Sequence, residues 1–130
     1  MNKFTKRLLA LGLALSIVAG AGGISVFAES GKVTGTLNGY RTTGTYSIDR
    51  YGAKAGTSYA SNGSAIISSN FYYVNLITLQ GRSTTKSARN KKSASVSFKA
   101  PKNCYSIQIR NTHTVIASGK IWEKSYLATY

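Results

Sequence analysis

Side chains that could perform acid–base or nucleophilic chemistry are few in this 130-residue chain. It contains one histidine (His113), one cysteine (Cys104) and three carboxylates (Glu29, Asp49 and Glu123). Nucleophilic catalysis needs a nucleophile beside a base that a third group orients. Cys104 and His113 are nine residues apart, which is about 30 Å along one straight strand at ~3.3 Å per residue. The two are therefore expected to stay apart, with His113 at a turn as a polar surface residue.

Catalytic carboxylate pairs, metal sites and nucleotide-binding loops are also disfavoured, because the residues that they require are too few. Asp49 and Glu123 each have a basic neighbour in sequence, which is typical of ordinary surface charges. Two His/Cys side chains cannot form a four-ligand zinc site, and calcium loops need several carboxylates. No glycine-rich nucleotide-binding loop is followed by the lysine that it requires. The sequence predicts no enzyme, no cofactor, no metal site and no small-molecule substrate.

Positive charge is the strongest feature of the composition. The chain carries 17 Lys and Arg against three carboxylates, a formal net charge of +14. A positive charge of this size attracts polyanions over a long range, and binding is favoured further by the release of counterions from the polyanion. The segment Arg89-Asn90-Lys91-Lys92 is expected to be a mobile loop that meets the partner. The predicted polyanion-binding residues fall within 21 positions: Arg82, Lys86, Arg89, Lys91, Lys92, Lys99 and Lys102.

The charge alone does not select one anionic partner. Teichoic acid, anionic lipid headgroups and acidic polysaccharide would all be attracted by this charge, and non-specific nucleic acid fits equally well. Tyr72, Tyr73 and Trp122 are candidates for stacking against bases, but no sequence-specific nucleic-acid motif is present.

The first 28 residues predict export from the cell. Lys3, Lys6 and Arg7 precede an uncharged apolar stretch that closes on Val26-Phe27-Ala28, which is typical of a secretory signal peptide with cleavage after Ala28. The alternative is a retained membrane anchor, since 21 uncharged residues could span a bilayer. Residues 29–130 are then a single domain with a net charge of +11, secreted or associated with the cell wall.

Residues 29–130 show the period-two alternation of β-strands. Apolar and polar residues alternate over 40–48, 53–59, 93–100 and 105–110, and Val115 and Ala117 continue the last pattern. The segment 65–74 is apolar on both faces and is expected to be a central strand. A more polar strand is expected over 78–86, and a last one from Ile121 towards Tyr130. Seven or eight short strands predict an all-β, antiparallel sandwich, Ig-like or jelly-roll-like, with an open barrel as the alternative.

Two local patterns predict hairpins. Asn62-Gly63 favours a tight turn, because both residues tolerate a positive φ. The strings Thr34-Gly35-Thr36 and Thr43-Gly44-Thr45, nine residues apart, indicate an opening hairpin. Cys104 follows a Pro-containing turn and is expected to pack at a strand edge. Pairing of its thiol with a second chain, in a structural or assembly role, stays open.

The composition resembles that of small exported β proteins of Gram-positive bacteria, including secreted bacteriocins of the lactococcin type. This resemblance implies a β-sandwich, but no motif aligns, so it assigns no role to any residue. The function expected from the residues is electrostatic binding to an anionic envelope or extracellular polymer. The alternative is an antimicrobial, bacteriocin-like protein that acts on a bacterial envelope.

Overall fold

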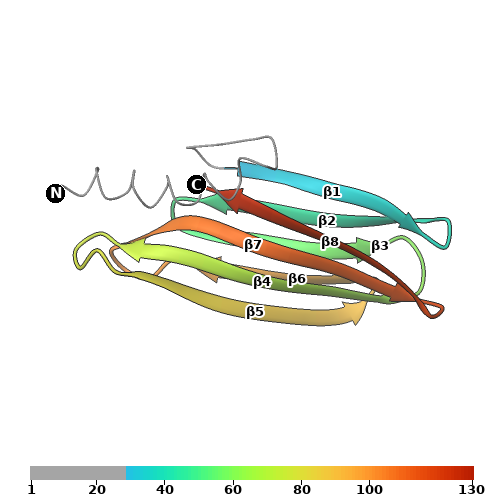
Figure 1. Cartoon of the computed structure of the whole chain (residues 1–130). Helices are drawn as coiled ribbons and strands as arrows, with labels where there is room; N and C mark the ends of the chain where they lie inside the picture. The colour runs from blue at the N-terminus through green and yellow to red at the C-terminus, as the bar shows by residue number, and fades with distance from the viewer. Residues whose placement is uncertain (1–28) are drawn as a thin grey trace.

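The computed structural model describes residues 29–130 as two antiparallel β-sheets packed face to face (Figure 1). The predicted signal peptide, residues 1–28, lies outside the described residues. Eight strands make up the fold: β1 (Glu29–Leu37), β2 (Tyr40–Asp49), β3 (Gly52–Tyr59), β4 (Ser64–Asn75), β5 (Gly81–Lys91), β6 (Ser93–Lys99), β7 (Cys104–Ala117) and β8 (Lys120–Thr129).

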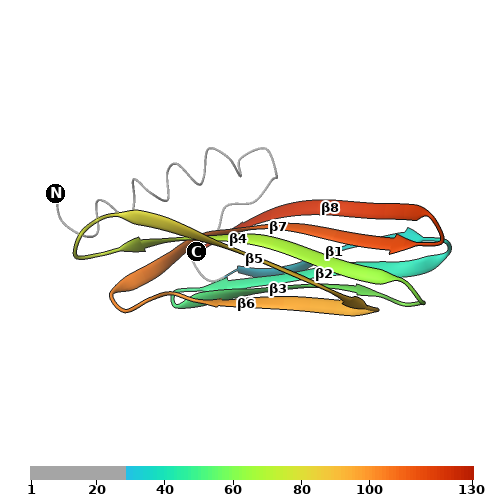
Figure 2. The ribbon, with the colours of Figure 1, turned by 90° about the horizontal axis from the view of Figure 1, so that it is seen from below.

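The strands divide equally between the two layers seen edge-on in Figure 2. One sheet has the order β1-β2-β3-β6, called here sheet A, and the other has the order β5-β4-β7-β8, called sheet B. Each sheet is open, so the predicted sandwich is confirmed and the open barrel is not formed. The apolar strand β4 lies inside sheet B between β5 and β7, as its two apolar faces predict.

The core lies between the sheets and is built by alternate residues of the strands other than β5, which contributes the half-buried Ala88. Ile48, Ile67, Phe71 and Ile109 are almost completely buried, and the ring of Phe71 lies 5.3 Å from that of Phe98 across the two layers. Burial of such side chains stabilises the fold by about 1.5–3 kcal/mol each. The alternating sequence therefore produces one apolar face and one polar face on each sheet.

Strand β7 contains an irregularity that changes which residues face the core. Its pairing with β4 shifts between Tyr72 and Tyr73, so that Ile107 has no direct partner. Ser106 and Ile107 are consequently both buried although they are neighbours in sequence. One extra residue in a strand is a β-bulge, which moves every later side chain to the opposite face.

Two hairpins close with residues of positive φ, but not at the predicted Asn-Gly pair. Asn38-Gly39 links β1 to β2 and Ser118-Gly119 links β7 to β8, with both residues of each pair in the left-handed region. The opening hairpin predicted from the Thr-Gly-Thr repeat is thus confirmed. The predicted hairpin at Asn62-Gly63 is wrong, because β3 and β4 belong to different sheets.

Gly63 has a different role in the chain crossing between β3 and β4. A Cβ atom at this position would lie 2.8 Å from the carbonyl oxygen of Ile116 and 3.0 Å from Cβ of Ala117. The chain can therefore pass close to the end of β7 only because residue 63 has no side chain. Close approach, rather than positive φ, explains the glycine.

Candidate functional site

The predicted basic loop is part of a strand. Arg89, Asn90 and Lys91 belong to β5, and only Lys92 lies between β5 and β6. The prediction of a mobile loop is therefore wrong. Because β5 pairs with β4 on one side only, it is an edge strand, and its charged side chains are exposed. Lysine and arginine are common on edge strands because they discourage pairing with another chain.

The chain at Lys92 is held in place from both sides. Its backbone N–H donates to the carbonyl of Gly63 (3.1 Å), and its carbonyl accepts from the N–H of Tyr59 (2.7 Å). Lys92 has a φ of 63°, which allows the chain to turn from sheet B to sheet A in a single residue. The basic segment is consequently a fixed part of the sandwich.

Lys86 links the two edge strands in the middle of β5. Its Nζ donates to the carbonyl of Ser97 in β6 at 2.7 Å and lies 5.2 Å from the centre of the Phe98 ring. The side chain thus closes the side of the sandwich between β5 and β6. One of the hydrogen-bond donors of the Lys86 ammonium group is therefore already bonded within the protein.

The seven predicted residues do not form one compact patch. Five of them follow β5 and its turn and are called here the basic edge: Arg82, Lys86, Arg89, Lys91 and Lys92. Arg82 and Lys92 are separated by about 33 Å at ~3.3 Å per residue. Arg82 meets Lys102 at one end, where both line a hollow of about 260 Å³ beside Tyr73. Lys99 pairs with Gly52 on the outer face of sheet A instead.

The carboxylates do not neutralise the basic edge. Asp49 Oδ1 accepts from the N–H of Tyr51 at 2.8 Å, and Glu123 Oε1 accepts from the hydroxyl of Thr114 at 3.0 Å. The hydrogen bonds of Glu29 are also with neutral donors, the hydroxyl of Tyr126 and the N–H of Thr129. All three carboxylates of residues 29–130 are thus bonded to neutral groups away from β5.

Tyr126 joins the two sheets beside Glu29. Its ring stacks on Tyr46 with centroids 4.2 Å apart and an angle of 16° between the planes. A hydrogen bond with Tyr46, burial and the neighbouring Glu29 together raise the pKa of Tyr126. This tyrosine therefore stays neutral, and the contact fixes the first residue of β1 against the last residues of β8.

The predicted stacking residues are less available than expected. Trp122 is buried, only 8% exposed, and a Cβ atom at Gly35 would lie 2.2 Å from its indole nitrogen. Tyr72 and Tyr73 are half-buried. The prediction that Trp122 stacks on an outside partner is wrong, because the glycine on β1 lets the indole pack inside the sandwich.

An aromatic–cation cluster that the sequence did not predict lies at the end of the molecule that carries Arg82. Arg50 donates from Nη2 to the hydroxyl of Tyr105, and its Cζ lies 3.8 Å from the Tyr105 ring centre. The Tyr51 ring packs edge-on against Tyr105 at 6.0 Å and is 60% exposed. The cluster joins the β2–β3 turn of sheet A to β7 of sheet B.

His113 is a core residue and not the polar surface residue that was predicted. It is fully buried in the middle of β7, with Nδ1 3.1 Å from Oγ1 of Thr57 and no hydrogen-bonding partner at Nε2. Burial lowers its pKa, an effect that a hydrogen bond with the Gly56 backbone opposes. A Cβ atom at Gly44 would lie 2.4 Å from the imidazole ring. Gly44 thus makes room for this neutral imidazole.

Cys104 and His113 stand at separate places on the same strand, as the sequence predicted. Cys104 is the first residue of β7, and its free thiol is buried. The structure therefore agrees with a packing role at the strand end. A second buried polar pair lies further along β7, where the hydroxyl of Ser69 donates to Oδ1 of Asn111 at 2.7 Å and leaves Nδ2 of Asn111 without a partner.

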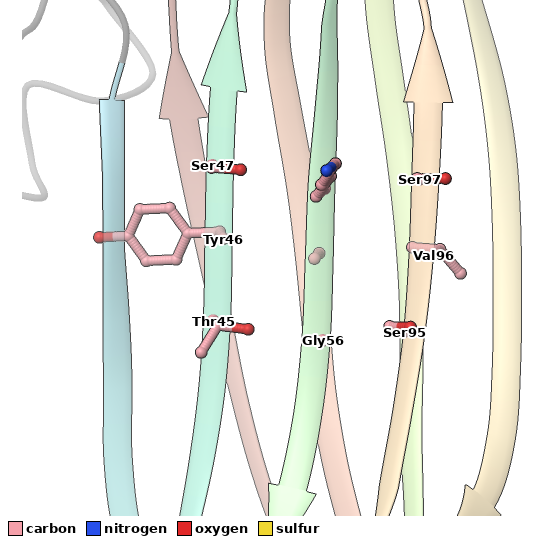
Figure 3. Close-up of a pocket in the computed structure, with 9 residues that line it drawn as sticks. Thr45, Tyr46, Ser47, Gly56, Ser95, Val96 and Ser97 are labelled. Atoms are coloured by element: carbon pink, nitrogen blue, oxygen red, sulfur yellow. The ribbon is translucent and has the colours of Figure 1, made fainter.

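A groove runs along β3 on the outer face of sheet A (Figure 3). Its middle section, of about 610 Å³, contains two rows of directly paired residues: Thr45, Gly56 and Ser95, then Ser47, Lys54 and Ser97. A hollow of about 300 Å³ that reaches Tyr51 shares Ser47 and Lys54 with it. A hollow of about 190 Å³ at the other end shares Thr45, Gly56 and Ser95. These three connected hollows are called here the β3 groove.

Residues 29–130 contain neither a membrane-spanning helix nor a cluster of metal-binding side chains. No helix there is long and apolar enough to cross a membrane. The same residues contain no group of three or more His, Cys, Asp or Glu side chains able to hold a metal ion.

Comparisons with known proteins do not assign a family to this chain. No protein-family model matches the sequence, and no curated protein matches it either. Among solved structures, it is similar to part of a glycosyl hydrolase family 2 member from Bacteroides cellulosilyticus, at 9% identity and a TM-score of 0.24. The match covers 77% of this chain and 13% of that protein, and a likeness at this level carries no argument about function.

Proposed function

We propose that this is an exported β-sandwich protein that binds an anionic polymer of the cell envelope or extracellular space along the basic edge. The observation that supports this proposal is the arrangement of five exposed cations on one edge strand and its turn, without a carboxylate beside them. The edge extends for about 33 Å, which favours an elongated polyanion over a small ligand. Teichoic acid and acidic polysaccharide are such polymers.

The mechanism is electrostatic attraction by a rigid array of charges. Each polymer charge that a cation neutralises releases a bound counterion, so affinity falls steeply as salt concentration rises. Because the backbone around Lys92 is fixed in the fold, binding does not require ordering of a loop.

The test compares two triple variants with equal charge changes. Arg89→Glu, Lys91→Glu and Lys92→Glu reverse the basic edge, and Arg41→Glu, Lys120→Glu and Lys124→Glu reverse three exposed cations elsewhere. We expect only the first variant to lose retention on purified cell walls across a salt series. Equal losses in both would mean that net charge alone matters, and unchanged retention in the first would refute the proposal. Dye release from anionic vesicles would instead favour the antimicrobial alternative.

A further inference from the structure

The two outer faces of the sandwich use their hydroxyl groups differently. On sheet B, neighbouring strands bond to each other through side chains, as in Ser87 to Ser68 (3.1 Å), Asn70 to Thr85 (3.0 Å) and Thr112 to Ser125 (3.3 Å). In the β3 groove, the hydroxyls of Thr45, Ser47, Ser95 and Ser97 have no hydrogen-bonding partner within residues 29–130. Side chains on the outer face of sheet B therefore bond partly to one another, whereas these four hydroxyls of sheet A are free to donate and accept.

The free hydroxyls surround a depression that the sequence itself creates. Gly56 lies between Thr45 and Ser95 in the same row and contributes no side chain to the floor (Figure 3). From Gly52 to Ser58 the groove is about 20 Å long, and the strands on either side of β3 are about 10 Å apart. These dimensions admit one extended chain lying along β3.

We propose that the β3 groove binds a linear acidic polysaccharide, which identifies the polymer class of the proposed function and rests on that function. Serine and threonine hydroxyls both donate and accept hydrogen bonds, so they complement sugar hydroxyls, which do the same. A polyphosphate chain only accepts hydrogen bonds, so it would use the hydroxyls of the groove as donors but not as acceptors. The exposed ring of Tyr51 at one end of the groove offers an apolar surface for a sugar ring.

The charges on this face match an acidic sugar rather than a neutral one. Lys54 stands inside the groove, Lys99 pairs with Gly52 at one end, and Lys32 is paired with Thr45 at the side. The one carboxylate that lines the groove, Asp49, already accepts a hydrogen bond from the backbone of Tyr51. Lys86 donates to the carbonyl of Ser97, so the basic edge contacts β6, the strand that carries Ser95 and Ser97 of the groove.

Two variants fill the groove without changing any charge. Gly56→Thr adds side-chain atoms to the floor, where a Cβ atom would lie 3.2 Å from Thr45 Oγ1 and 3.3 Å from the carbonyl of Ala94. Ser95→Phe changes an exposed residue and lays a ring across Gly56, a pairing that favours the folded sheet. Ser125→Phe, at an exposed position on the outer face of sheet B, is the matched control.

The experiment is titration calorimetry with the protein as purified from an expressing bacterium, using polygalacturonate, poly(glycerol phosphate) and inorganic polyphosphate. Loss of two hydrogen bonds predicts that both groove variants weaken polygalacturonate binding about tenfold. Polyphosphate binding should be unchanged, and Ser125→Phe should behave as wild type with all three polymers. Circular dichroism melting checks that each variant is folded.

The outcomes separate this inference from the proposed function. Unchanged polygalacturonate binding in a folded Ser95→Phe variant overturns the groove proposal, as does weakened binding of poly(glycerol phosphate) alone. Reversal of Arg89, Lys91 and Lys92 should weaken binding of all three polymers. If that reversal has no effect on any polymer, the basic edge fails as the binding surface whatever the groove variants do.

Discussion

The pH dependence of stability provides a direct test of the buried imidazole. His113 is the only histidine of the chain, and histidine is the side chain that ordinarily titrates between pH 6 and 7. Burial lowers the pKa of His113 in the folded protein. The unfolded chain therefore binds a proton below about pH 6.5, while the folded protein resists doing so. Stability is highest above that pH and falls as the pH drops below it.

The size of the effect follows from the linkage between protons and folding. One proton bound only by the unfolded state changes the free energy of unfolding by about 1.4 kcal/mol per pH unit at most. Between pH 7.5 and 5.5 the loss attributable to His113 is thus up to about 1.4 kcal/mol. Urea unfolding followed by fluorescence measures it, since Trp122 is the only tryptophan and is buried.

The matched variant is His113→Gln, which removes the titrating group but can still hydrogen-bond to Thr57. Between pH 7.5 and 5.5, the free energy of unfolding of this variant is expected to fall less than that of the wild type, because the contribution of His113 is missing. A wild-type protein whose stability changes no more than that of the variant would show that the folded state accepts the proton. The reasoning from burial would then be refuted.

Two further predictions concern packing around β7. Gly44→Ala should lower the free energy of unfolding by about 1–3 kcal/mol, because the added Cβ would lie 2.4 Å from the fully buried ring of His113. A urea unfolding curve that matches the wild type would contradict the close packing. The Cys104 thiol, which is buried and unpaired, should react with Ellman's reagent only when urea unfolds the protein, and rapid reaction in native buffer would show that the strand end is open.

The strands were predictable because alternation is a local property of the chain. In 53–59 and 109–117, the alternation in the sequence matches the alternation of buried and more exposed side chains in the structure. The apolar segment 65–74 belongs to β4, in the interior of sheet B. Local pattern also placed Cys104 at a strand end. The bulge at Ile107 could not be read from the alternation, because it depends on how β7 pairs with β4.

The position of His113 was predicted wrongly although a signal for it existed. Ile109, Val115 and Ala117 all have odd numbers, and all are buried between the two sheets. His113 falls in the same series and therefore had to face the core if the strand continued. The polar residues between 110 and 114 suggested a turn, but Gly44 and Thr57 on the other sheet accommodate the imidazole.

The basic segment was misplaced for a related reason. Charges at Arg89 and Lys91 are typical of a loop, yet an edge strand exposes its side chains almost as fully as a loop does. The two cases differ only in whether the backbone is paired with a neighbouring strand. Here it is paired, because Lys91 and Arg89 of β5 lie opposite Ser64 and Ile66 of β4. The sequence contains no local mark of that pairing.

The residue types alone determined the charge, the shortage of groups for catalysis and the all-β class. These properties depend on composition and on neighbours two residues apart. Tertiary structure decided which cations form an edge, why the imidazole is neutral and where the hydroxyls remain unpaired. The β3 groove brings together Thr45, Gly56 and Ser95 from three strands. Their alignment depends on strand register between distant segments, which is set by the burial of both sheets' apolar faces.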